Sequence, residues 1–180
     1  TTINHYKSNL RDSYFNLFEF WKIQDGVLGE GPYTALDEET CREVMGTFSK
    51  FCEEEMAISF AEGDRVPLTL SEDGDVTLPP GLKLAMEKFF EGEWHRIEHP
   101  EHLGGYGAPS ALQWACFEYL VGANPALGFY LLGNFMAKII DEHGTESQKA
   151  KYVDGLCNKR WGGTMVLTDP DAGSDVGAGR

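Results

Sequence analysis

The sequence has few cysteines and few basic residues, and each shortage excludes a class of function. Its four cysteines lie far apart and form no C-x-x-C pair. This spacing disfavours a zinc knuckle or a redox pair and predicts buried, reduced thiols. Fifteen Lys and Arg stand against 29 Asp and Glu, so the formal net charge is −14. Because nucleic-acid binding needs clustered cations, this balance excludes DNA and RNA as partners.

Long hydrophobic runs are missing as well. The most apolar window, residues 126–140, is interrupted by Asn134 and Lys138 and is too short to cross a bilayer. A buried helix is therefore predicted there, and no membrane span. No basic and apolar leader opens the sequence, so the cytoplasm is the expected compartment. With 180 residues, 42% of them hydrophobic, the chain can bury one core of real size.

Apolar residues recur at helical spacing along most of the chain. They predict helices over about 37–61 and 80–92, from Pro109 onward, from Pro125 to just before Gly144, and after a Thr145–Gln148 capping box. The helix after Pro125 is apolar around most of its circumference, so we expect it to be central and buried. Five helices then precede a single strand, which the β-prone run from Thr164 to Leu167 predicts.

Two further segments have a distinctive composition. The first thirty residues are too aromatic for a free tail, so we expect them to pack on the rest of the chain or on a neighbouring chain. The loop over 98–107 is rich in glycine and is long enough to approach a ligand. Its neighbouring His and Glu residues could suggest a metal cluster, but Pro100 breaks the helix that would align them. A solvated loop is the favoured interpretation.

The most informative stretch is TMVLTDPDAGSDVG, residues 164–177. A short apolar run ends in Thr-Asp-Pro and leads into a Gly/Ser/Asp loop, which places hydroxyls and backbone N–H groups where polar cofactor groups commonly bind. A calcium loop fits poorly, because its glycine falls one position too early and Arg180 stands where a bidentate glutamate is required. Since one strand cannot form a sheet alone, we expect the protein to continue beyond this sequence.

Four features follow one another along the chain: the helices, a Gly-Gly loop, the H-G-T-E-S-Q-K capping box and the T-D-P-D-A-G-S-D loop. This order resembles the N-terminal helical domain of the acyl-CoA dehydrogenase family, which runs into the family's middle β-domain. The resemblance covers about residues 37–180. It implies a mainly α fold, a helical bundle followed by the first strand of a β-domain. The implied domains are an aromatic extension over 1–35, a helical domain over 36–160 and the truncated start of the β-domain, with its FAD loop, over 161–180.

The resemblance also implies an FAD site in this last segment. The backbone of Met165 and Leu167 would lie near the flavin ring, and the Thr168 hydroxyl would hydrogen-bond its polar edge. Gly173 and Ser174 would approach the pyrophosphate, and Ser174 would also lie near the CoA part of the substrate. Small residues with N–H and hydroxyl donors suit an anionic diphosphate without needing positive charge.

The implied reaction is FAD-dependent α,β-dehydrogenation of an acyl-CoA thioester in fatty-acid β-oxidation or related catabolism. The implied partners are an electron-carrier flavoprotein and identical subunits in a homodimer or homotetramer. The family's base is a glutamate in its C-terminal helical domain, and nothing here matches its context, so no catalytic residue is assigned in this chain, and no metal ligand. Asp169 replaces the family's commoner Glu, and Met165 stands where an aromatic residue often sits.

The aromatic N-terminus is similar to that of a bacterial subgroup with an extended N-terminus, which includes enzymes for long-chain and sulfur-containing acyl-CoA thioesters. The alternative hypothesis is a non-catalytic helical module, or a degenerate relative, that binds a partner through this aromatic segment. The sequence that follows this chain in the protein would discriminate between the enzyme and the non-catalytic module. A further β-domain and a helical bundle with a base glutamate would support the enzyme.

Overall fold

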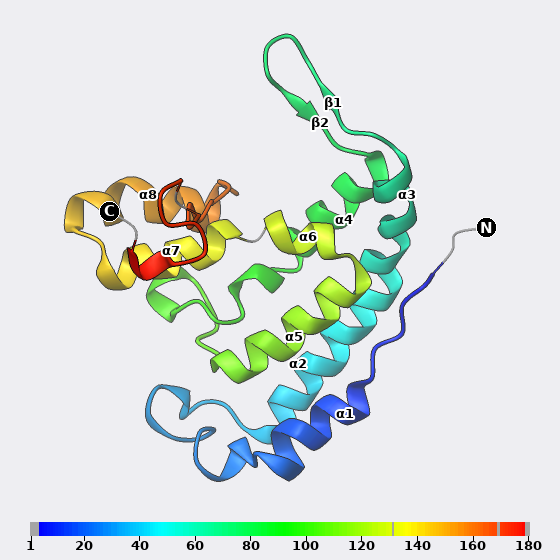
Figure 1. Cartoon of the computed structure of the whole chain (residues 1–180). Coiled ribbons are helices and arrows are strands. Elements are labelled where there is room, and N and C mark those ends of the chain that lie inside the picture. Colours follow the sequence, from blue (N-terminus) through cyan, green and yellow to red (C-terminus); the bar gives the residue numbers. More distant parts are fainter. Residues whose placement is uncertain (1–3, 131, 169, 179–180) are drawn as a thin grey trace. The chain divides into compact units, whose positions relative to one another are not determined.

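The computed structural model describes residues 4–130, 132–168 and 170–178 (Figure 1). The chain divides into two compact units, Thr1–Phe129 and Tyr130–Arg180. The prediction of a mainly α fold is confirmed, because the strands of the described residues form one two-stranded hairpin and the other regular elements are helical. No helix of these residues is both long and apolar enough for a membrane span.

Helices form most of the first unit and follow the apolar periodicity of the sequence. Their bounds are α1 (Leu10–Tyr14), α2 (Glu38–Phe51), α3 (Phe60–Arg65), α4 (Pro80–Glu91), α5 (Ser110–Ala123) and α6 (Pro125–Tyr130). The helix predicted over 37–61 is a continuous path made of α2, a π turn over Cys52–Met56, a 3-10 turn over Ala57–Ser59 and the start of α3. Asp37 begins it by accepting a hydrogen bond from the Thr40 N–H (2.8 Å).

The core of this unit lies between α2, α4 and α5, and Figure 1 shows α1, α2 and α5 side by side. Phe48 of α2 and Tyr119 of α5 are at most 2% exposed. The thiols are also buried and none forms a disulfide, as the spacing predicted: Cys41, Cys52, Cys116 and, in the second unit, Cys157. Burial of aromatic and aliphatic side chains on facing helix stripes is the main source of stability here.

The aromatic N-terminal segment lies against α2. The hydroxyl of Tyr14 donates to the backbone oxygen of Arg42 (2.8 Å). The Arg42 guanidinium lies over the rings of Tyr14 and Phe18, 4.6 and 4.3 Å from their centroids. Phe18 is buried, whereas Phe20 and Trp21 are 64% and 71% exposed. The segment therefore packs on the chain, while some of its aromatic side chains remain exposed.

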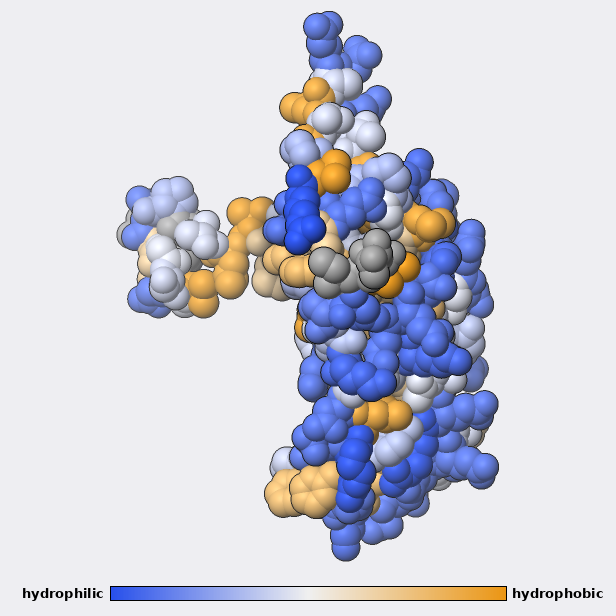
Figure 2. Space-filling model, turned by 90° about the vertical axis from the view of Figure 1, so that its right-hand side faces the viewer, coloured by the Kyte–Doolittle hydropathy of each residue, from blue (hydrophilic) through white to orange (hydrophobic). Residues whose placement is uncertain are grey.

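A small hairpin separates α3 from α4. Its strands β1 (Thr69–Leu70) and β2 (Val76–Thr77) pair antiparallel, with Leu70 opposite Val76. Gly74, with φ 87°, adopts the left-handed conformation that closes the turn. Figure 2 shows apolar side chains along the hairpin and at its base, on a surface that is otherwise mostly hydrophilic.

The second unit is built on α7 (Leu132–His143) and α8 (Glu146–Asn158), which lie against each other. The predicted capping box is confirmed: the Gln148 N–H donates to Thr145 Oγ1 (3.3 Å) and the Thr145 N–H donates to Gln148 Oε1 (2.8 Å). Ala137 of α7 and Val153 of α8 are among the buried contacts.

The expectation of a helix buried on all sides after Pro125 is wrong. The segment is divided into α6 and α7, with residue 131 outside the described residues. Phe129 is 74% exposed and Ile139 is 46% exposed. A helix that is apolar all round needs neighbours on every side, and the chain itself covers only part of this circumference.

Candidate functional site

The segment that follows α8 contains every site residue predicted from the sequence. Arg160 has a left-handed backbone (φ 57°), which reverses the chain after the helix. The Trp161 N–H then donates to the backbone oxygen of Gly155 (3.1 Å). Residues 161–168 form neither helix nor strand, so the strand predicted from Thr164 to Leu167 is not formed. A strand is stable only beside a partner strand, which this segment lacks among the described residues.

The apolar side chains of this segment face solvent. Met165 and Leu167 are each 58% exposed, and Val166 between them is 90% exposed. The side chain of Thr168 is exposed too. Consecutive exposed apolar residues are unusual on a protein surface and are typical of surfaces that bind something.

A turn over Pro170–Ala172 leads to Gly173, which has a left-handed backbone (φ 57°). A Cβ at Gly173 would meet nothing within 4 Å, so the backbone conformation and not space favours glycine here. The Asp175 N–H donates to the Ala172 oxygen (3.1 Å), and a 3-10 turn follows over Val176–Ala178. Ser174 is exposed. Asp169, the departure noted in the sequence, lies outside the described residues.

The structure thus places Met165, Leu167, Thr168, Gly173 and Ser174 on one exposed segment, as their order in the sequence requires. How this segment is attached is not evident from the sequence. The indole of Trp161 lies directly on α8, over Gly155. The sequence signal for this contact was weak: a bulky residue shortly after a helix that contains a glycine.

The glycine-rich loop over 98–107 is folded back on its own stem. The Tyr106 N–H donates to the Arg96 oxygen (3.0 Å), and the Arg96 guanidinium donates to the Gly104 oxygen (2.9 Å). The Tyr106 hydroxyl donates to Glu93 (3.0 Å), and this hydrogen bond raises the pKa of Tyr106. Backbone and side-chain hydrogen bonds therefore both connect the loop to its stem.

The expectation of a solvated loop is wrong for His99, which is 6% exposed. A Cβ on Gly105 would lie 2.0 Å from the His99 backbone oxygen, so only glycine allows the chain to cover this histidine. In the part of the chain that the structure describes, no group of three or more His, Cys, Asp or Glu residues is arranged to hold a metal ion.

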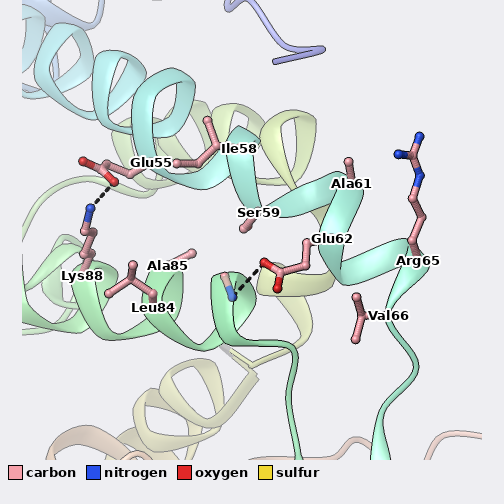
Figure 3. Close-up of a pocket in the computed structure, with 11 residues that line it drawn as sticks. Glu55, Ile58, Ser59, Ala61, Glu62, Arg65, Val66, Leu84, Ala85 and Lys88 are labelled. Carbon is pink, nitrogen blue, oxygen red and sulfur yellow. Dashed lines mark hydrogen bonds and ion pairs between the residues drawn. The ribbon is translucent and has the colours of Figure 1, made fainter. Parts of the chain in front are cut away.

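A cavity of about 500 Å³ lies in the first unit between α4 and the path from the π turn to α3 (Figure 3). Its lining is largely apolar and includes Ile58 and Leu84. Glu62 accepts a hydrogen bond from the Gly81 N–H (2.9 Å), which satisfies a free donor at the start of α4. Such a carboxylate stabilises the positive end of the helix.

Four polar side chains at this cavity, those of Glu55, Ser59, Glu62 and Lys88, have partners within the chain. The Lys88 ammonium forms an ion pair with the Glu55 carboxylate at one end. The Ser59 hydroxyl donates to the Met56 oxygen (2.7 Å) and accepts from the Asn124 side chain (2.8 Å). None of these four groups has the hydrogen-bonded arrangement of an activated nucleophile or a general base.

Residues 38–160, the stretch from the first residue of α2 to just beyond α8, match the sequence pattern of the family described as "Acyl-CoA dehydrogenase, N-terminal domain". The chain belongs to the acyl-CoA dehydrogenase family. This result confirms the resemblance that the capping box and the T-D-P-D-A-G-S-D loop indicated.

Individual family members cover the chain to different extents. The broad-specificity linear acyl-CoA dehydrogenase FadE5 of Mycobacterium tuberculosis is 42% identical over 179 residues, which is 99% of this chain and 29% of that protein. The 3-methylmercaptopropionyl-CoA dehydrogenase of Ruegeria pomeroyi is 36% identical over 80% of this chain and 24% of its own length. The chain thus spans less than a third of these family members.

Proposed function

We propose that this chain is part of an FAD-dependent acyl-CoA dehydrogenase, which forms the α,β double bond of an acyl-CoA thioester. The observation that carries the proposal is the 42% identity to a broad-specificity linear acyl-CoA dehydrogenase over nearly the whole chain. Cytoplasmic location, assembly into a homodimer or homotetramer and electron transfer to a carrier flavoprotein belong to the same proposal.

The chemistry of the segment from Met165 to Ser174 fits FAD. The exposed Thr168 and Ser174 hydroxyls can donate hydrogen bonds to polar edges of the cofactor. Gly173 has no side chain to keep a diphosphate from the backbone, and backbone N–H groups suit an anion in an acidic protein. The exposed side chains of Met165 and Leu167 provide apolar surface for a ring system.

FAD, when bound, supplies the acceptor for the β-hydrogen, which leaves as hydride. The residues of this chain then have binding and orienting roles: Thr168 and Gly173 toward the cofactor, and Ser174 toward both the cofactor and the CoA part of the substrate. The base that removes the α-proton is assigned to no residue of this chain. It belongs to another part of the protein.

The first experiment is an anaerobic titration of the full-length protein with acyl-CoA thioesters of increasing chain length, followed by visible absorption. We expect a yellow protein whose oxidised flavin band at about 450 nm is lost on reduction by substrate. The thioester that bleaches the band at the lowest concentration identifies the preferred chain length. A colourless protein that takes up no FAD would contradict the proposal and support a non-catalytic helical module.

Variants test the residues themselves. Thr168→Val removes one hydroxyl donor, and we expect the Kd for FAD to rise about tenfold, the effect of a lost hydrogen bond of about 1.4 kcal/mol. Thr164→Val is the matched control, because Thr164 is also exposed but precedes the proposed contacts. Equal affinity of both variants and the wild type would remove Thr168 from the proposed site.

A further inference from the structure

The residues just after α8 lie against α7 and α8 through contacts that only glycine permits. A Cβ on Gly155 would lie 2.2–2.5 Å from three ring carbons of Trp161. On α7, a Cβ on Gly133 would lie 2.1 Å from the Trp161 backbone oxygen. A Cβ on Gly163 would lie 2.8 Å from the side chain of Met136. We call Gly133 and Gly155 the glycine notch.

The backbone holds Trp161 in the same place. Its N–H donates to the Gly155 oxygen (3.1 Å), and the left-handed Arg160 directs the chain back across the helix end. In Figure 1 the chain after α8 accordingly turns back toward α7. Neither residue of the glycine notch has a positive φ, so the notch requires glycine for space and not for backbone conformation. Trp161 is thus anchored twice, by a backbone hydrogen bond and by the packing of its indole on α8.

The anchor lies three residues before the proposed cofactor segment, because Gly162, Gly163 and Thr164 separate Trp161 from Met165. Within this short stretch Gly163 is itself packed against α7, since a Cβ there would lie 2.8 Å from the Met136 side chain and 3.0 Å from the Gly133 Cα. A displacement of Trp161 would therefore also disturb the contact that leads into residues 165–174. We propose that Trp161 is a positioning residue for the FAD site. Through its contact with the glycine notch, it fixes the position and the direction in which residues 165–174 extend from the helices. This inference rests on the proposed function.

The test compares glycine substitutions in the full-length protein. Gly155→Ala places a methyl group against the indole, whereas Gly162→Ala is the control, because a Cβ at Gly162 meets nothing within 4 Å. Apoprotein is titrated with FAD, and flavin fluorescence gives the Kd. Amide hydrogen exchange of residues 161–168 in the apoprotein is the second readout. We expect Gly155→Ala to raise the Kd at least tenfold and to speed exchange of the Trp161 amide, and Gly162→Ala to stay within twofold of wild type.

Trp161→Ala provides an independent test that adds no collision, so it also serves if Gly155→Ala fails to fold. We expect Trp161→Ala to raise the Kd for FAD about as much as Gly155→Ala does. The double variant should have the same Kd as Trp161→Ala alone, because the indole that the added methyl group would meet is gone. A folded Gly155→Ala or Trp161→Ala protein that binds FAD with wild-type affinity would overturn the positioning role, even if its melting temperature fell. Wild-type protein that binds no FAD would overturn the proposed function itself.

Discussion

The helices of the first unit and the segment after α8 bury their apolar residues to opposite extents. Phe48 of α2 is 2% exposed and lies in a cluster with Phe51, Phe89 and Trp94. Val166 is 90% exposed. The helices therefore obtain their stability from each other, whereas residues 164–168 gain almost none from the chain. Apolar surface that the chain itself leaves uncovered is available for binding, which is the role proposed for this segment.

Substitution in the aromatic cluster should have the largest effect. We expect Phe48→Ala to lower the free energy of unfolding by about 3–5 kcal/mol, because it removes a buried ring and leaves a cavity. Urea denaturation followed by circular dichroism measures the change. Phe129→Ala is the control, since Phe129 is 74% exposed. A loss under about 1 kcal/mol for Phe48→Ala would show that the first unit is loosely packed.

Alkaline pH should weaken the first unit next. Burial raises the pKa of the Cys41 thiol to about 11 and that of the Cys116 thiol to about 12. Between about pH 9 and these values the unfolded state loses the thiol protons and the folded state keeps them, so stability falls as pH rises, by up to about 1.4 kcal/mol per pH unit and thiol. Denaturation midpoints from pH 8 to 10 measure the loss. Cys116→Ala should flatten this dependence, and an unchanged slope would contradict the assignment.

Loss of the α8 cap should cost less. Thr145→Ala removes the side-chain oxygen that accepts from the Gln148 N–H, and we expect a loss of about 1 kcal/mol. Thr145→Ser keeps the oxygen and should stay close to wild type. Hydrogen exchange at the start of α8 reports the local effect. Equal exchange rates in the two variants would mean that the capping box contributes nothing measurable.

The smallest effect is expected at the exposed segment. Val166→Ala should change the free energy of unfolding by less than about 0.5 kcal/mol, because its side chain has almost no contact to lose. The urea midpoint of the apoprotein checks this expectation. A loss comparable with that of Phe48→Ala would mean that Val166 is buried in solution and would remove the contrast between the two regions.

Much of the helical structure could be predicted, because it depends on local signals. Asp37 and the Thr145 capping box begin their helices where the sequence indicated, and Gly144 follows α7 directly. The position of the candidate segment followed from its Gly, Ser and Thr pattern. The seat of Trp161 on Gly155 could not be predicted, since it joins residues through space after a chain reversal. The burial of His99 beneath Gly105 was missed for the same reason.

The sequence by itself determined most of the helix positions, the family and the candidate cofactor segment, because periodicity, caps and motifs are read from residues near one another in the chain. Only the tertiary structure decided which apolar residues are covered. Phe48 and Val166 are both apolar, and their burial depends on which elements pack beside them. The strand expected from Thr164 to Leu167 is the clearest case: β-prone residues alone do not make a strand, since its hydrogen bonds must come from a neighbouring strand.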